Sequence, residues 1–147
     1  MDDDVTRVKL EIYRHFAEGG QQPSTASVAA AVSLTPAEVK QAYAALRAQR
    51  LLWLEADGET IRMAPPFSGV PTKHSVIVEG RSYFANCAWD SFGVVAALRS
   101  AGVVMSSCAQ SGEDLRLSVG ADGPEPSDWI FHCLVPAAHW WDDLVFT

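Results

Sequence analysis

A proline-rich stretch near the middle of the chain constrains the fold more than any other feature. Pro65, Pro66 and Pro71 lie within eight residues, together with Gly69. Proline fixes φ and lacks the backbone donor, so this stretch cannot form a helix or a central strand. It predicts a linker over residues 65–73 between two units, 1–64 and 74–147. Phe67 is expected to tuck back onto one of them.

The first unit has the pattern of three helices and a hairpin. Apolar spacing predicts a helix over residues 5–16 that stops near Gly19, and a short second helix opens at 23–25. A capping box at 35–38, with proline at the first helical position, starts a third helix that runs to Arg50. Residues 51–63 then form two strands around an Asp-Gly turn. This order is typical of a winged helix-turn-helix.

A winged helix can bind DNA through its third helix, which here offers Lys40, Arg47 and Arg50. The charge balance argues against this role. Residues 1–65 carry seven Lys or Arg against nine Asp or Glu, and residues 66–147 carry four against nine. Because phosphate binding needs a basic excess, nucleic acid is an unfavourable partner. The alternative is a module used for packing or dimerisation.

The second unit reads as a mixed or antiparallel sheet with short helices, so the whole chain is predicted to be α+β. Helices are expected at 90–98 and 136–143. Strands are expected over residues 74–78, 81–85, 103–107, 115–119, 129–135 and 144–147. The last strand stops after four residues, so we expect a chain cut short at its C-terminus.

Cys87 and Asp90 stand three residues apart, which places them on one face if the segment is helical. A thiolate is a ligand for soft metals and a carboxylic acid is a proton donor, so the pair suits cleavage of a carbon–metal bond. The alternative is a buried structural cysteine beside a helix-start aspartate.

Four blocks of the second unit resemble the alkylmercury lyase (organomercurial lyase) family. They are the strand pair 76–85, the Cys-Ala-Trp-Asp block 87–90, the block 106–112 with Cys108, and the strand 115–119. The resemblance covers residues 74–147, and the first unit only by its architecture. It implies that two cysteine thiolates hold an organomercurial while an aspartate protonates the carbon–mercury bond. Cys87 matches the first cysteine and Asp90 the aspartate.

The resemblance also implies a pocket around these two residues. Phe84, Trp89 and Phe92 are candidate walls, although each is equally typical of ordinary core. Cys108 matches a cysteine of the family that is usually structural.

The family's second catalytic cysteine lies eleven or twelve residues after the proline that matches Pro136. Counting from there reaches Thr147 or a position just past it, so this sequence has no cysteine at that place. Either the chain was cut before it or the protein has lost it, and a single thiol should make a poor lyase. Cys108 or Cys133 could substitute only within about 5 Å of Cys87, roughly the span of two sulfurs on one metal.

The neighbours of Cys133 are apolar, which predicts a buried strand position. His132 and His139 are alternative ligands, and we expect them instead at the surface or the edge of the core. Three cysteines at irregular spacing, without a Cys-x-x-Cys pair, do not form a disulfide framework.

Three functions stay open: a carbon–mercury lyase, a binding or sensing module for Hg(II) or another soft metal, and a winged-helix regulator. For the lyase, the ligands are a small organomercurial and small thiols, no cofactor is required, and Hg(II) is bound substrate or product. The acidic N-terminus is unlike a signal peptide, and no apolar run is long enough to span a membrane, so we expect a cytoplasmic protein. The sequence does not predict the oligomeric state.

Overall fold

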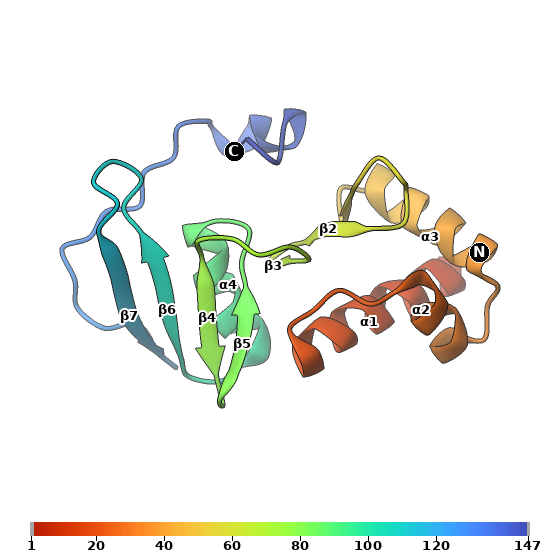
Figure 1. The fold of residues 1–147 in the computed structure, drawn as a ribbon, viewed down its shortest axis with the longest axis horizontal. Helices are drawn as coiled ribbons and strands as arrows, with labels where there is room; N and C mark the ends of the chain where they lie inside the picture. Colours follow the sequence, from red (N-terminus) through yellow and green to blue (C-terminus); the bar gives the residue numbers. More distant parts are fainter. Residues whose placement is uncertain (1, 147) are drawn as a thin grey trace.

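The computed structural model describes residues 2–146 and has the α+β fold expected from the sequence. Three helices and a three-stranded sheet form one end of the molecule, and a five-stranded sheet with a single helix forms the other (Figure 1). Within the described residues, no helix has both the length and the apolar character that a membrane span requires.

The three N-terminal helices form as their caps predict. They are α1 (Asp2–Gly19), α2 (Thr25–Val32) and α3 (Pro36–Ala48). The side chain of Ser24 accepts the Ser27 N–H at the start of α2, and Thr35 and Glu38 form a complete capping box at the start of α3. The apolar faces of the helices meet in one core, which includes Val8, Ile12, Phe16, Val28, Val39, Tyr43 and Leu46.

The first sheet contains one strand more than expected. Strands β1 (Trp53–Leu54), β2 (Ile61–Ala64) and β3 (Phe67–Ser68) pair antiparallel in that order. The interpretation of residues 65–73 as a plain linker is therefore wrong for β3. The prolines bracket this dipeptide rather than occupy it, so both of its residues keep their backbone donors and add an edge strand to β2.

The second sheet is antiparallel throughout, with the order β5-β4-β6-β7-β8. Its strands are β4 (Ser75–Val78), β5 (Arg81–Phe84), β6 (Gly102–Ser107), β7 (Asp114–Gly120) and β8 (Gly123–Pro124). Helix α4 (Ala88–Leu98) covers the face that carries Val78 and Gly102, where a side chain on Gly102 would meet Val95. Residues of opposite parity, such as Ile77 and Val103, lie on the other face.

Both strands predicted near the C-terminus are wrong. Residues 129–135 are irregular, and residues 144–146 form a turn, while Thr147 lies outside the described residues. The short helix expected between them is present as the 3-10 helix η1 (Ala137–Asp142). An apolar run is consistent with a strand or with an irregular segment that packs on another element, and here Phe131 packs on Trp89 of α4. Cys133 is consequently exposed rather than buried.

The two ends of the molecule are locked together where α1 meets β5. The Tyr83 hydroxyl donates to the Ala17 carbonyl at 2.8 Å. Gly20 has φ +70°, and a Cβ there would lie 2.4 Å from the Ser82 carbonyl oxygen, so this approach requires glycine. Phe67 bridges to Ala85, and its ring stacks on Phe16 at 5.4 Å and contacts Tyr83 at 6.0 Å.

Because Phe67 joins both sheets, we expect Phe67→Ala to lower the free energy of unfolding by about 3–5 kcal/mol. The side chain is 3% exposed, so its removal leaves a cavity at the junction. The measurement is urea unfolding followed by circular dichroism. Leu10→Ala is the matched control, because Leu10 is 60% exposed and its loss should cost less than about 0.5 kcal/mol. Equal stability of the two variants would contradict this role of Phe67.

Candidate active site at the start of helix α4

Cys87 is the N-cap of α4, with extended backbone angles of φ −148° and ψ 177°. Its sulfur accepts the Asp90 N–H at 3.5 Å, in the place where a serine or aspartate oxygen usually caps a helix. This contact holds the Cys87 sulfur and the Asp90 backbone on the same turn. The structure therefore brings together the two residues that the sequence spacing put on one face.

The Asp90 carboxyl is half-buried, and burial raises its pKa. Hydrogen bonds with Asn86 and Cys87 oppose this shift, and burial is the larger effect. The Asn86 side-chain amide donates to Asp90 Oδ2 at 3.0 Å, and Asn86 Oδ1 is buried and accepts no hydrogen bond. Asn86 thus orients the carboxyl, while burial increases the fraction that carries a proton at a given pH.

Two effects compete at the Cys87 thiol. The helix N-terminus and its N–H groups favour the thiolate, whereas burial disfavours it. Burial is the largest influence, and it raises the pKa of Cys87 above the ordinary value of 9.0. The free site therefore holds a thiol at neutral pH, and a soft metal would bind by displacing its proton.

The segment around Cys133 lies over the first turn of α4. The Phe131 ring packs on the Trp89 ring, with centroids 5.6 Å apart. Cys133 is the smallest of the influences that raise the pKa of Cys87. Sequence reasoning named both cysteines but put Cys133 on a buried strand.

Tyr13 of α1 also borders the site, and sequence reasoning missed it. Its hydroxyl donates to the Pro65 carbonyl at 3.0 Å, and its pKa is raised first by burial and then by the charge of Asp90. In the sequence Tyr13 was only one member of an apolar stripe, and no local signal links it to a residue 77 positions away.

Cys108 lies apart from this arrangement, in the turn between β6 and β7. Its sulfur accepts the Ser111 N–H at 3.5 Å, and hydrogen bonds with Ser111 lower its pKa. The neighbours that act on it, Gln110, Ser111 and Glu113, all belong to the same turn. Cys108 is therefore the more readily ionised thiol, in a different environment from Cys87.

The histidines do not join the cysteines. His139 pairs with Asp142 at 3.0 Å, and His132 is exposed. Over residues 2–146, no three His, Cys, Asp or Glu side chains are close enough together to hold a metal ion.

The three expected pocket aromatics have different surroundings. Phe92 packs against the core, and Trp89 is 57% exposed and contacts Phe131. Phe84 alternates with the buried Tyr83 and Ala85, so it lies on the sheet face away from α4. Trp89 alone is a plausible wall beside an incoming ligand.

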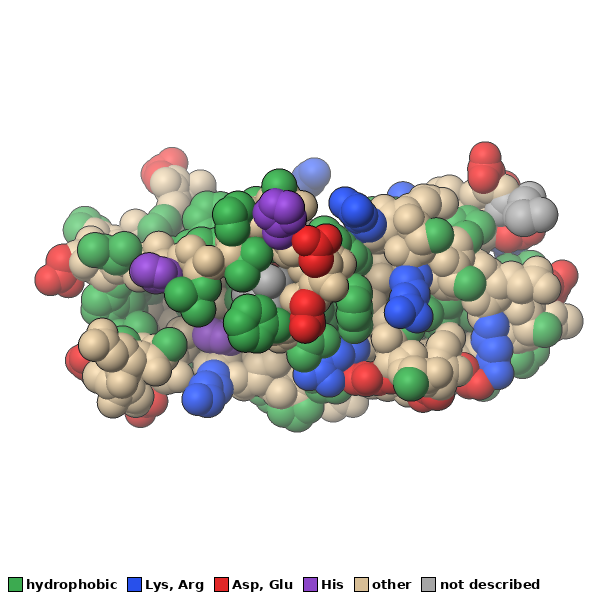
Figure 2. All heavy atoms as spheres, turned by 90° about the horizontal axis from the view of Figure 1, so that it is seen from above, with side chains coloured by type: hydrophobic (Ala, Val, Ile, Leu, Met, Phe, Trp, Pro, Cys, Tyr) green, Lys and Arg blue, Asp and Glu red, His purple; other side chains and the backbone are tan. Residues whose placement is uncertain are grey.

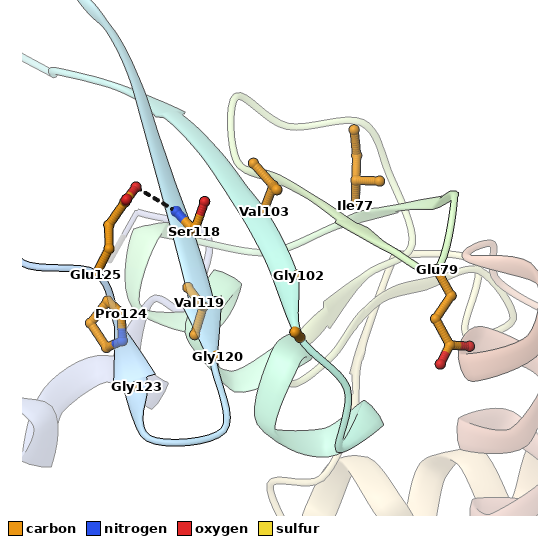
Figure 3. Close-up of a pocket in the computed structure, with 11 residues that line it drawn as sticks. Ile77, Glu79, Gly102, Val103, Ser118, Val119, Gly120, Gly123, Pro124 and Glu125 are labelled. Carbon is orange, nitrogen blue, oxygen red and sulfur yellow. Dashed lines mark hydrogen bonds between the residues drawn. The ribbon is translucent and has the colours of Figure 1, made fainter.

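A surface hollow lies elsewhere, on the sheet face opposite α4 (Figure 3). Ile77, Val103 and Pro124 contribute to its lining, and Glu125 at its rim accepts the Ser118 N–H at 2.8 Å. The hollow is shallow and open, and it contains no thiol, histidine or lysine.

Comparison with known proteins identifies the family of this chain. The family model described as alkylmercury lyase matches residues 67–147, more than half of the sequence. The chain belongs to the alkylmercury lyase family. A search of curated proteins found no match.

A solved structure described as the mercury-bound form of MerB2 is similar to this member of the alkylmercury lyase family, with a TM-score of 0.66 and 22% identity. The match covers 87% of this chain and 61% of the other, so this chain spans about three-fifths of that protein's length. At this identity the likeness establishes a common fold.

The basic residues of α3 in this family member are engaged within the molecule. Lys40 forms an ion pair with Glu59, and the Arg47 guanidinium lies 5.6 Å from the centre of the Trp53 ring. Arg50 is exposed at the end of α3 with φ +61°. These contacts lower the charge available for phosphate, so they weaken the DNA-binding hypothesis further.

The raised pKa of Asp90 predicts how stability depends on pH. The folded protein keeps the Asp90 proton after the unfolded chain has lost it, so stability contributed by this group falls as pH rises from the ordinary value of 3.8 through the raised one. We expect Asp90→Asn to remove this decline. At pH values above the raised pKa of Asp90, the variant should be more stable than the wild type. Urea unfolding of both proteins across that range is the measurement; parallel pH curves would contradict a raised pKa.

Proposed function

We propose that this chain cleaves the carbon–mercury bond of small organomercurials by protonolysis. The observation that carries the proposal is the joint placement of Cys87 and Asp90 on the first turn of α4, with a sulfur ligand and a half-buried carboxyl in contact. Family membership and the shared fold support the same reaction class.

The first step is capture of the substrate, R–Hg⁺. The Cys87 thiol loses its proton to solvent and its sulfur forms a bond to mercury. Mercury is soft and prefers thiolate, so this step proceeds although burial keeps the free thiol protonated.

The second step is proton transfer. The Asp90 carboxylic acid gives its proton to the carbon attached to mercury, and the electron pair of the carbon–mercury bond becomes the new carbon–hydrogen bond. The hydrocarbon leaves, Hg(II) stays on sulfur, and Asp90 is left as a carboxylate that solvent reprotonates. Nothing is oxidised or reduced. Hg(II) then passes to small thiols in solution, which regenerates the Cys87 thiol.

Asn86 and burial prepare Asp90 for this step. The Asn86 amide fixes one carboxyl oxygen, and burial raises the pKa of the carboxyl. An acid held in a partly dry site keeps its proton to a higher pH than one in water, which favours proton donation.

The test is incubation of the full chain with phenylmercuric acetate and excess small thiol in deuterium oxide. We expect benzene carrying one deuterium, in an amount that exceeds the blank without protein and grows with protein concentration. Mercury retained on the protein without benzene would contradict cleavage. That result would support the second candidate, a soft-metal capture module, which the Cys87 sulfur at the start of α4 favours.

A further inference from the structure

We propose that Asn86 selects which oxygen of Asp90 delivers the proton. Its side-chain amide holds Asp90 Oδ2, so the proton is carried on Oδ1 and leaves from there to the carbon attached to mercury. Asn86 is thus a positioning residue, which acts through Asp90. The inference rests on the proposed function and deepens it, because it identifies what aims the acid.

Asn86 lies between the end of β5 and the start of α4, and its backbone is held on both sides. The residue before it, Ala85, is fully buried and donates its N–H to the His74 carbonyl at 2.9 Å. The residue after it, Cys87, is the N-cap of α4, and its carbonyl accepts the Ser91 N–H at 3.2 Å. A short side chain on a backbone held in this way is suited to orienting a neighbouring group.

The contact between Asn86 and Asp90 differs from the cap of helix α3. In α3 the carboxyl at the same helical position, Glu38, accepts the Thr35 N–H at 2.8 Å and closes a capping box. In α4 the Asp90 carboxyl accepts the side-chain amide of Asn86 at 3.0 Å. An amide N–H can donate to one oxygen of a carboxyl while the other oxygen carries a proton, so this contact persists in the protonated acid.

The orientation of the Asn86 amide leaves the acid proton free. Its Nδ2 faces Asp90, while its Oδ1 is buried and accepts no hydrogen bond from the described residues. Unpartnered acceptors of this kind are uncommon and destabilise the folded chain. The opposite orientation would turn Asn86 Oδ1 toward Asp90, where it would accept the acid proton and hold it between the two side chains. The observed orientation keeps Asp90 Oδ2 as an acceptor, which leaves Asp90 Oδ1 to bear the proton.

Apolar surroundings strengthen the influence of this single donor. The Phe131 ring packs on the ring of Trp89, the residue before Asp90, with centroids 5.6 Å apart. Figure 2 shows apolar side chains gathered on the face that carries the C-terminal segment. The exposed hydrophobic residues of this segment are Trp129, Ile130, Phe131, Leu134, Val145 and Phe146. A hydrogen bond beside apolar side chains meets less competition from water, so the amide orients the carboxyl more firmly than it would in open solvent.

Proton delivery from Asp90 Oδ1 balances as a simple transfer. The Oδ1–H bond breaks, its proton joins the electron pair of the carbon–mercury bond, and the electron pair of the broken bond stays on Oδ1. Asp90 becomes a carboxylate, to which the Asn86 amide still donates. Such a transfer depends on alignment, since a displacement of about 1 Å can lower a rate by roughly 10²-fold.

The first test compares Asn86→Leu with the wild type in a single turnover of phenylmercury. Leucine has nearly the shape of asparagine but no amide, and the change also removes the unpartnered Oδ1. We expect mercury capture at the wild-type rate and benzene release slowed by roughly 10- to 100-fold. Gln41→Leu is the matched control, because it removes an exposed amide of α3, and both of its rates should equal those of the wild type.

A double-mutant cycle separates positioning from a structural role. Asn86→Leu is combined with Asp90→Asn, which has no acidic proton to position. We expect the slowing caused by Asn86→Leu to disappear in this background, because residues that act as a unit are not additive. An equal slowing with and without the Asp90 carboxyl would overturn the inference, as would unchanged or faster benzene release in Asn86→Leu alone.

A second measurement does not depend on cleavage. Asn86 is the only asparagine in the sequence, so labelling with ¹⁵N-asparagine gives a single side-chain amide to follow by nuclear magnetic resonance. We expect one of its protons to exchange with water about 10-fold more slowly than the other, the scale of one hydrogen bond of average net strength. Asp90→Leu should abolish this difference.

The two measurements distinguish failure of this inference from failure of the proposed function. Benzene release from the wild type, with both amide protons exchanging equally, rejects only the role of Asn86. A protected amide proton without any benzene rejects cleavage, and with it the delivery of a proton by Asp90.

Discussion

Replacement of Cys87 by serine is expected to lower benzene release from phenylmercuric acetate by at least about 10³-fold, the scale on which enzymes lose activity when the attacking group is removed. A hydroxyl is a hard and weakly acidic ligand, so it does not hold mercury against the Asp90 carboxyl. A serine oxygen can still accept the Asp90 N–H at the N-cap, which keeps the start of α4 intact. The loss should therefore come from chemistry and not from unfolding.

Cys108→Ser is the control for Cys87→Ser, because it removes a thiol of lowered pKa from a turn outside the site. We expect its benzene release to equal that of the wild type. Equal release from Cys87→Ser, or a comparable loss in Cys108→Ser, would show that the reactive thiol had been assigned to the wrong cysteine.

Replacement of Asp90 by asparagine is expected to slow benzene release by roughly 10²- to 10⁴-fold, the usual contribution of a positioned general acid. The amide has nearly the same shape as the carboxyl and still offers an oxygen to the Asn86 side chain, but it has no acidic proton to give. Mercury capture should persist, since the Cys87 sulfur is unchanged.

The pH dependence of the wild type distinguishes this role from a structural one. Cleavage through Asp90 should fall as pH rises through its raised pKa, because the carboxyl is then deprotonated. Capture by Cys87 should rise in the same direction, because thiols ionise more readily at higher pH. Asp122→Asn, an exposed substitution in the turn between β7 and β8, is the control and should leave both steps unchanged.

Local sequence signals predicted the first unit well. The capping box at Thr35 and the serine cap of α2 fix where helices begin, and the Asp-Gly turn fixes the hairpin, because each depends on neighbours in the chain. The strand β3 was missed for a physical reason. Prolines at 65, 66 and 71 dominate the pattern, while pairing of β3 depends on the free edge of β2.

In the C-terminal segment, local sequence signals did not predict the structure. Its apolar residues are equally consistent with a strand and with a segment that packs side chains on a distant helix. Here the contact between Phe131 and Trp89 attaches the segment to α4, and that contact is not encoded within residues 129–135 themselves.

At the site, the spacing of Cys87 and Asp90 was sufficient to place them together, since one helical turn connects them. Asn86 is adjacent to Cys87 in the sequence, but its hydrogen bond with Asp90 forms only when the first turn of α4 is in place. The C-terminal segment reaches the first turn of α4 through the contact of Phe131 with Trp89, a tertiary contact that sequence spacing could not predict.

A single-turnover experiment tests the central claim most directly. One equivalent of phenylmercury is loaded onto the wild type and onto Asp90→Asn, and bound mercury and released benzene are followed together. The account predicts equal capture by both proteins, with benzene formed in step with the loaded mercury only on the wild type. Release of benzene by Asp90→Asn at the wild-type rate, or capture by the wild type without any benzene, would contradict it.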